Sequence, residues 1–274
     1  MRQDVFGTVL ELQSPQDFSF VLRYGVPFSV EAAGSEVRFG VDSPQHGRLL
    51  IRFAGAPLAG TAEPQEAAIV LAEAMPAYEA LYPHPALIKL QGHGAVAEGY
   101  AAIFRWPAGE SLRAEGALRR LQRQPLLSRL RMIDPIFDFH AYAEAQGWQP
   151  VGFYDGSLAA DGETGRLLLT DIDLYRPAPA YNDRGRMPGS SRFLSPEEYV
   201  PGAPLDGLTA QYTMGALAFA LFADHGSRER GAWMAGAPLY QVAARACAEE
   251  RAERFSSYAA FLAAWREAAG ETVG

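Results

Sequence analysis

Over the first sixty residues, and again between residues 86 and 106, short apolar runs alternate with turn-forming residues, a pattern typical of β-strands. The strands predicted on this basis are Phe18–Tyr24, Val37–Val41, Arg48–Phe53, Ala86–Leu90 and Tyr100–Trp106, with a glycine-rich hairpin joining the last two. A stretch rich in Ala, Leu and Glu predicts a helix from about Pro64 to Tyr82, with Pro76 as a kink or an early break.

After Pro107, most apolar residues recur at the spacing of a helix. The predicted elements are a helix over Leu126–Gln146, a short buried strand over Leu167–Thr170, a helix over Thr209–Ala223 that is apolar on nearly every face, and a last helix capped by Ser256 and ending at Gly270. Asp134-Pro135 within the first of these helices is also compatible with a fresh helix start. Strands followed by helices indicate an α+β fold, with a small sheet lobe over residues 1–106 and a larger helical lobe over 107–274.

Composition narrows the function classes. The 24 Lys+Arg and 32 Asp+Glu residues give a net charge of −8, which argues against non-specific DNA binding, and nucleic acid is not an expected partner. No apolar run approaches the roughly 18 residues of a membrane span, so no membrane association is expected. Cys247 is the only cysteine, and we expect a cytoplasmic protein. The only lysine, Lys89, stands in Leu-Ile-Lys-Leu, which excludes a Walker-type phosphate loop.

Acidic residues follow two apolar runs within the segment VGFYDGSLAADGETGRLLLTDIDL, at 151–174. Asp155 follows the first run, whereas Asp171 and Asp173 follow the second, so a hairpin between them would bring both loops to one edge of a small sheet. That arrangement suits Mg²⁺ bound with phosphate oxygens, and a carboxylate that accepts a hydroxyl proton during phosphoryl transfer. Alternatively, these residues only form a turn and a strand end, and Asp-x-Asp also occurs in metal-dependent glycosyltransferases.

The order of motifs resembles the protein-kinase-like fold over roughly residues 25 to 268, in particular a divergent bacterial serine/threonine kinase-like family. The motifs that carry this resemblance are Leu49-Leu50-Ile51-Arg52 for the Val-Ala-Ile-Lys strand, His84-Pro85-Ala86-Leu87-Ile88-Lys89-Leu90 for the entry to the fourth strand, Ile103-Phe104-Arg105-Trp106 for gatekeeper and hinge, Phe153-Tyr154-Asp155 for His-Arg-Asp, Asp171-Ile172-Asp173 for Asp-Phe-Gly, Gly189–Glu197 for the end of the activation segment and Tyr212-Thr213-Met214-Gly215 for the buried sixth helix.

The resemblance implies a bilobal fold that transfers the γ-phosphate of Mg-ATP to a hydroxyl, either a protein Ser/Thr or a small molecule. It implies that Asp155 is the catalytic base and that Asp171, Asp173 and Ser157 bind the metal. It also implies a buried ion pair between Glu197 and Arg254. The ATP-binding residues that it implies are Arg52, its helix partner Glu73, Phe104, Arg105 and Trp106.

Several positions depart from the family pattern. Arg52 replaces the lysine that holds the phosphates, and Ser157 stands where an asparagine would bind the second metal. The segment Glu31-Ala32-Ala33-Gly34-Ser35-Glu36 keeps one glycine of the phosphate loop and adds acids. The alternative is therefore a pseudokinase, which binds or regulates without transferring phosphate. We favour activity, because both loop carboxylates are retained. A glycosyltransferase would leave Ser195-Pro196-Glu197 and Arg254 unexplained.

Overall fold

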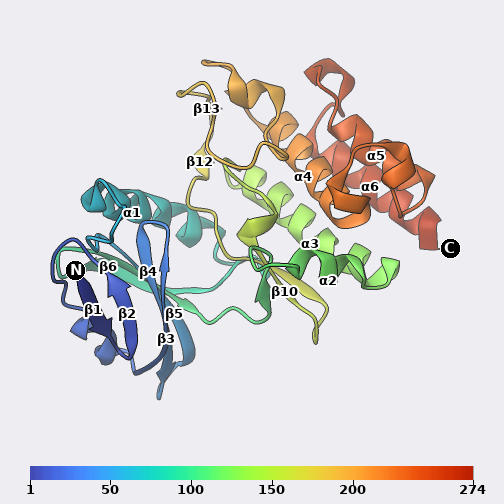
Figure 1. Ribbon diagram of the computed structural model, residues 1–274. Helices are drawn as coiled ribbons and strands as arrows, with labels where there is room; N and C mark the ends of the chain where they lie inside the picture. Colours follow the sequence, from blue (N-terminus) through green and yellow to red (C-terminus); the bar gives the residue numbers. More distant parts are fainter. Residues whose placement is uncertain (274) are drawn as a thin grey trace. The chain divides into compact units, whose positions relative to one another are not determined.

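A computed structural model describes residues 1–273 of the chain, which separates into two compact units (Figure 1). Unit 1 contains Met1–Tyr82 and Ile88–Pro107, and unit 2 contains Pro83–Leu87 together with the chain from Ala108 onward. The chain thus passes from unit 1 into unit 2 at residue 83, returns to unit 1 at residue 88 and enters unit 2 again at residue 108. None of the described helices is long and apolar enough to cross a membrane.

The strands and helices of unit 1 are β1 (Arg2–Val5), β2 (Thr8–Glu11), β3 (Val26–Ala33), β4 (Glu36–Ser43), β5 (Gly47–Ala54), α1 (Pro64–Leu81), β6 (Leu90–Val96) and β7 (Gly99–Arg105). Those of unit 2 are β8 (Glu110–Ser111), α2 (Ala117–Gln122), α3 (Leu126–Ala145), β9 (Trp148–Gln149), β10 (Leu158–Asp161), β11 (Arg166–Leu169), β12 (Arg176–Pro177), β13 (Ala180–Tyr181), β14 (Pro204–Leu205), α4 (Gly207–Phe222), α5 (Ala237–Ala246) and α6 (Tyr258–Val273).

Unit 1 is built on a five-stranded antiparallel sheet with the order β3-β4-β5-β7-β6. Alternate residues of β4 and β5, such as Phe39 and Phe53, are fully buried in a cluster with residues of the β1–β2 hairpin and of 18–21. Helix α1 packs along β5, β6 and β7 (Figure 1). Because side chains alternate along a strand, Arg52 points away from this cluster and reaches Tyr78 of α1.

Two predicted strands of unit 1 are wrong. The run Phe18–Tyr24 contains a 3₁₀ helix at Ser19–Arg23, because Asp17 accepts hydrogen bonds from the backbone N–H and hydroxyl of Ser19 at 2.7 and 2.9 Å. Ala86–Leu90 forms only an isolated bridge at Leu87, and the strand begins at Leu90. The glycines expected in the hairpin lie inside β6, and the turn falls at residues 97–98, where Ala97 has φ 49°.

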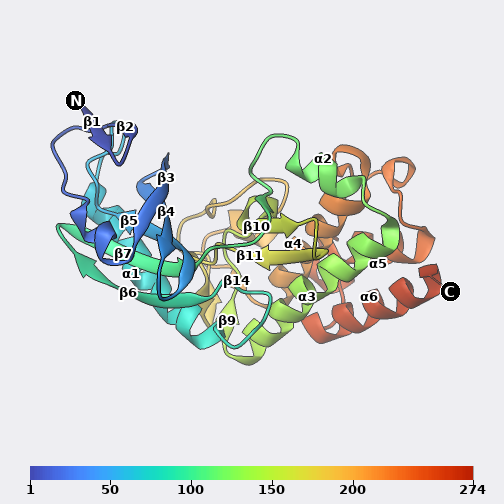
Figure 2. The same cartoon turned by 90° about the horizontal axis from the view of Figure 1, so that it is seen from below.

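Unit 2 is organised around α4, of which every residue except Leu208 is buried, as its uniformly apolar sequence predicts. Helices α3, α5 and α6 pack against it, and Figure 2 shows α3 and α6 lying side by side. Helix α3 continues through Pro135 instead of starting afresh there, and α1 continues through Pro76. Both prolines are exposed, so water can bond the carbonyls that a proline leaves unpaired.

The last helix also differs from the prediction at both ends. Its cap is Ser257 rather than Ser256, since the Ser257 hydroxyl accepts the backbone N–H of Ala260 at 3.1 Å. The helix does not end at Gly270 but continues to Val273.

A buried ion pair anchors the loop before α4 to the segment before α6. Both carboxylate oxygens of Glu197 accept hydrogen bonds from Arg254, at 2.7 Å from Nη1 and 2.9 Å from Nη2. The side chains are 4% and 0% exposed, respectively. Arg251 adds a second bond to Glu197 and also binds Asp206, the N-cap of α4. The predicted Glu197–Arg254 pair is confirmed.

We expect Glu197→Ala to lower the free energy of unfolding by about 3–5 kcal/mol, because Arg254 would remain buried without its counter-charge. Urea denaturation followed by circular dichroism measures the change. The control is Glu253→Ala, at an exposed acid of the same segment, which should stay within about 0.5 kcal/mol of the unsubstituted protein. Wild-type stability of the Glu197 variant would contradict the structural role of the pair.

Candidate functional site

The hairpin β10–β11 brings the two acidic loops of unit 2 together. Leu158, the first residue of β10, pairs with Leu169, the last residue of β11. One step further, the backbone N–H of Thr170 donates to the carbonyl of Ser157 at 2.9 Å. Because antiparallel strands place the start of one beside the end of the other, Asp155 and Asp171 lie at the same end of the hairpin. The convergence expected from the sequence is therefore present.

Three of the predicted metal ligands line one pocket of about 410 Å³ in unit 2. They are Ser157, Asp171 and Asp173, and the lining also includes Gly189 and Ser190. Within the described residues there is no cluster of three or more His, Cys, Asp or Glu side chains that could bind a metal ion by themselves. A cation here would therefore need further oxygen ligands from phosphate or water, which is how Mg²⁺ is commonly bound.

Asp155 lies in a 3₁₀ turn just before β10 and is only 6% exposed. Its Oδ1 accepts the backbone N–H of Gly156 at 3.0 Å, and its Oδ2 accepts Nη2 of Arg192 at 2.7 Å. Arg192 comes from the segment that resembles the end of a kinase activation segment. The predicted catalytic carboxylate is thus held by an arginine that the sequence does not place next to it.

Asp171 is held in a similar way by Arg113. Nη2 of Arg113 donates to Oδ2 of Asp171 at 2.7 Å, while its Nε donates to the carbonyl of Gly156 at 2.8 Å. A Cβ atom at Gly156 would lie 2.3 Å from the ring of Tyr154 and 2.9 Å from Cγ of Arg113. A side chain larger than that of glycine would clash at this position. Through its hydrogen bonds to Gly156 and Asp171, Arg113 joins the Asp155 turn to the Asp171 loop.

A buried histidine, His140, contacts residues next to both acidic loops. Nδ1 of His140 donates to the carbonyl of Ile136, and its Nε2 accepts the hydroxyl of Tyr175, both at 2.7 Å. Burial lowers the pKa of His140 to about 4, so the imidazole is neutral at pH 7 and keeps this tautomer. Its ring packs against Phe153, two residues before Asp155, at a centroid distance of 5.1 Å.

In unit 1, Arg52 on β5 pairs with Glu36 on β4. Nε of Arg52 donates to Oε2 of Glu36 at 2.9 Å, Nη2 donates to Oε1, and Nη1 lies 3.3 Å from the Tyr78 hydroxyl. Glu73, the predicted helix partner, is exposed and forms no ion pair with Arg52. Within unit 1 the counter-charge beside Arg52 comes from Glu36 of the neighbouring strand, and the role expected of Glu73 stays a prediction.

The predicted gatekeeper and hinge residues lie at the end of β7. Phe104 is fully buried, with its ring 5.0 Å from that of Tyr78. Arg105 and Trp106 are exposed, and the Trp106 ring packs edge-on against Phe28 of β3 at 4.9 Å. The end of β7 therefore carries one buried aromatic ring, Phe104, and one exposed aromatic ring, Trp106.

Three partners of the site residues are not predicted from the sequence, namely Arg113, Arg192 and Glu36. Glu36 could have been found from strand register, because Arg38 and Arg52 are directly opposite each other and two like charges need an acid nearby. Glu36 lies two residues from Arg38 on the same face of β4, and it pairs with both arginines. No comparable local signal connects Arg113 with Asp171 across 58 residues of chain.

Comparisons with solved structures identify the architecture. Two structures of the kinase domain of Mycobacterium tuberculosis PknI, a single and a double variant, match with a TM-score of 0.61 each. Identity is 20% and 19%, and the matches cover 89% and 90% of this chain and 95% and 96% of the kinase domain. The chain has a protein-kinase-like fold. Neither a scan against protein-family models nor a search of curated proteins found a match.

The kinase-like fold includes the α+β organisation expected from the sequence, with a small antiparallel sheet and a larger helical part. In this fold, the segment that resembles the end of the activation segment closes with Ser195-Pro196-Glu197-Glu198. Ser195 and Glu198 form a capping box, in which Oε2 of Glu198 accepts the backbone N–H and the hydroxyl of Ser195 at 2.8 and 2.9 Å. Burial raises the pKa of Glu198 to about 7.

Glu198 should make folding stability depend on pH between about 4.5 and 7. The folded state binds the proton more tightly than the unfolded state, so this contribution is complete below pH 4.5 and disappears as the pH rises through 7. Between these pH values the free energy of unfolding of the wild type should fall by on the order of 3 kcal/mol relative to that of the Glu198→Gln variant, which cannot titrate at this position. Urea denaturation at pH 4.5, 6 and 8 measures it, and parallel pH profiles for both proteins would contradict the assignment.

Proposed function

We propose that this protein transfers the γ-phosphate of Mg-ATP to a hydroxyl group. The observation that carries the proposal is the convergence of Ser157, Asp171 and Asp173 on one pocket, next to the turn that contains Asp155. The protein-kinase-like fold supports the reaction class, because the two loops follow each other in the order that this fold requires.

The residues present fit a magnesium ion. Asp171 and Asp173 offer carboxylate oxygens and Ser157 offers a hydroxyl, which are hard oxygen donors of the type that Mg²⁺ prefers. When bound, Mg²⁺ would neutralise phosphate charge and orient the phosphates. Arg113 now donates to Oδ2 of Asp171, so a cation at that oxygen must displace the guanidinium.

In this proposal Asp155 accepts the proton of the attacking hydroxyl. Its hydrogen bond from Gly156 and its ion pair with Arg192 fix the orientation of the carboxylate. From unit 1, Arg52 would hold phosphate charge, and Phe104, Arg105 and Trp106 would hold the nucleotide base. The exposed ring of Trp106 suits stacking against a base.

The second candidate is a pseudokinase, favoured by the state of the charged side chains. Asp155, Asp171 and Arg52 are each engaged by an oppositely charged residue, namely Arg192, Arg113 and Glu36. If these pairs are stronger than the competing interactions with Mg-ATP, the protein binds nucleotide weakly and transfers nothing.

Nucleotide titration with and without Mg²⁺, followed by transfer of labelled γ-phosphate, tests the two candidates. We expect Mg²⁺ to tighten ATP binding, Asp171→Asn to abolish that dependence, and Asp155→Asn to lower transfer by about 10²–10⁴-fold while nucleotide binding persists. Asp161→Asn, at the opposite end of the same hairpin, is the matched control and should change neither readout. Mg²⁺-independent binding together with no transfer by the wild type would instead establish the pseudokinase.

Glu36 should restrain nucleotide binding, since its carboxylate competes with phosphate for Arg52. We expect Glu36→Gln to tighten ATP binding several-fold by isothermal titration. Glu31→Gln removes the same charge from an exposed position of the same β3–β4 hairpin and serves as the control. Equal affinities for the Glu36 and Glu31 variants would rule out a specific competition at Arg52.

A further inference from the structure

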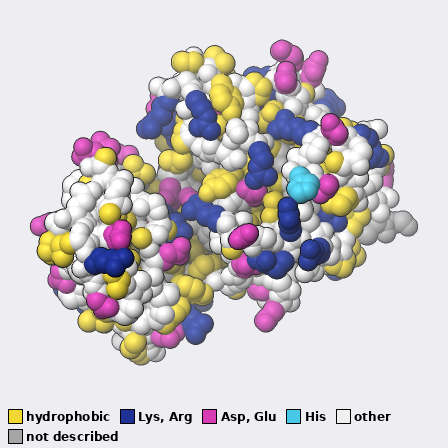
Figure 3. Space-filling view, in the orientation of Figure 1, with side chains coloured by type: hydrophobic (Ala, Val, Ile, Leu, Met, Phe, Trp, Pro, Cys, Tyr) yellow, Lys and Arg dark blue, Asp and Glu magenta, His cyan; other side chains and the backbone are white. Residues whose placement is uncertain are grey.

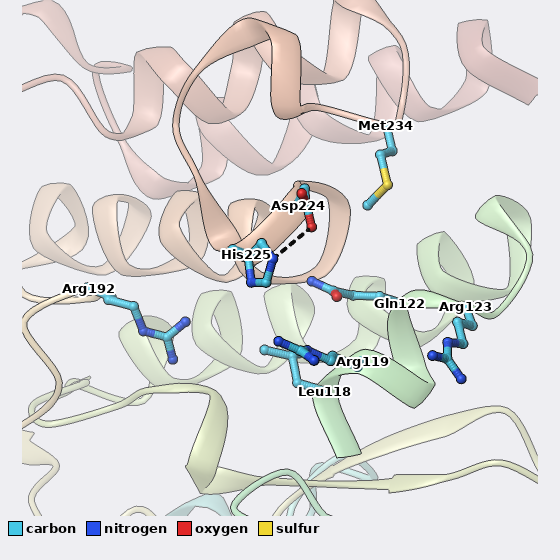
Figure 4. A pocket seen from close by; sticks show the side chains of 8 residues that line it. All are labelled: Leu118, Arg119, Gln122, Arg123, Arg192, Asp224, His225 and Met234. Atoms are coloured by element: carbon cyan, nitrogen blue, oxygen red, sulfur yellow. Dashed lines mark ion pairs between the residues drawn. The ribbon is translucent and has the colours of Figure 1, made fainter. Parts of the chain in front are cut away.

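Unit 2 contains a second pocket, of about 560 Å³, that the proposed chemistry does not use. Its basic side chains come from two places: Arg119 and Arg123 from α2 and its C-cap, and Arg192 from the segment around Ser190. Figure 4 shows Arg192 and Arg123 on opposite sides of this arginine pocket, with Arg119 between them. The loop after α4 closes it with Asp224 and His225.

The arginine pocket carries an excess of positive charge. Arg119 and Arg123 are exposed and form no ion pair with any residue that the structure describes. The one lining carboxylate, Asp224, lies 3.6 Å from Nε2 of His225. The chain as a whole has a net charge of −8, so this surplus is local, and Figure 3 shows basic side chains gathered on unit 2. Such a surplus attracts an anion.

The walls of the arginine pocket are fixed before any ligand arrives. The side-chain amide of Gln122 donates to the carbonyls of Ala220 and Ala223 at 2.8 and 3.2 Å, which ties α2 to the end of α4. The backbone N–H of Met234 donates to the carbonyl of Phe222 at 2.8 Å. Because these contacts hold the backbone, binding an anion would require ordering only the arginine side chains.

Arg192 connects the arginine pocket to the candidate base. It lines the pocket, and its Nη2 lies 2.7 Å from Oδ2 of Asp155. A ligand group that contacts Arg192 in the pocket is therefore separated from Asp155 by a single guanidinium group. A second negative group near Arg192 would share its charge and weaken its hold on Asp155.

We propose that the arginine pocket binds an anionic side chain, carboxylate or phosphoryl, of an acidic polypeptide substrate. The pocket is larger than one such group needs and is flanked by Leu118 and by Met234, which is 48% exposed, so it offers apolar contacts for neighbouring residues. This inference rests on the proposed function for the role of Asp155, whereas binding is measurable without transfer.

Fluorescence anisotropy with the full chain tests the proposal. The probes are a labelled serine peptide flanked by Asp and Glu, the same peptide with Asn and Gln, and one with phosphoserine in place of the acids. We expect one or both anionic peptides to bind at least about tenfold more tightly than the neutral one, and the double variant Arg119→Gln/Arg123→Gln to lose that advantage. Arg166→Gln, at an exposed arginine of β11, should bind like the wild type.

The relative affinity of the two anionic peptides identifies which oxyanion the pocket prefers, and preference for either supports the proposal. Equal binding of all three peptides, or unchanged binding by the double variant, would overturn it. Inorganic phosphate that binds while neither anionic peptide does would leave a simple ion site and also overturn it. Binding is measured without ATP, so failure of the wild type in the phosphate-transfer assay would count against the proposed function and leave the peptide-binding result unchanged.

Discussion

The pairing of a buried arginine with a carboxylate is the interaction on which both units of this structure depend. All but one of its 24 basic residues are arginines, which stay protonated when buried and are stabilised by an acid nearby. For Arg254 this acid is Glu197, and for Arg52 it is Glu36. The first pair fixes the fold and the second lies at a candidate ligand position, so the same interaction serves stability in one unit and competes with binding in the other.

The parts of the fold that depend on periodicity could be predicted from the sequence. Helix α4 was recognised because its residues are apolar on all faces, and β5 and β7 because their apolar runs lie between turn residues. The run Phe18–Tyr24 is equally apolar, but one side chain, Asp17, decides for a 3₁₀ turn. A hydrogen bond from one polar side chain to a nearby backbone group cannot be predicted from the pattern of apolar positions.

The candidate site also has one part that could be predicted from the sequence and one part that could not. Asp155 and Asp171 could be brought together from the sequence, because a hairpin between two acidic loops has few arrangements. Their arginine partners could not be predicted, because Arg113 and Arg192 come from segments that are distant in the chain. The sequence alone does not distinguish them from several neighbouring arginines. Long-range partners of a charge follow from packing, which only the folded chain displays.

Anchoring and recognition are divided between different side chains on α2. Gln122 holds the helix to α4, whereas Arg119 and Arg123 contribute nothing to that attachment. Changes at the two exposed arginines therefore carry little penalty in folding, whereas a change at Gln122 removes two hydrogen bonds between α2 and the end of α4. Evolution can therefore alter the charge of this surface, and with it the ligand preference, without removing the contacts of Gln122, Ala117 and Leu121 that hold α2 in place.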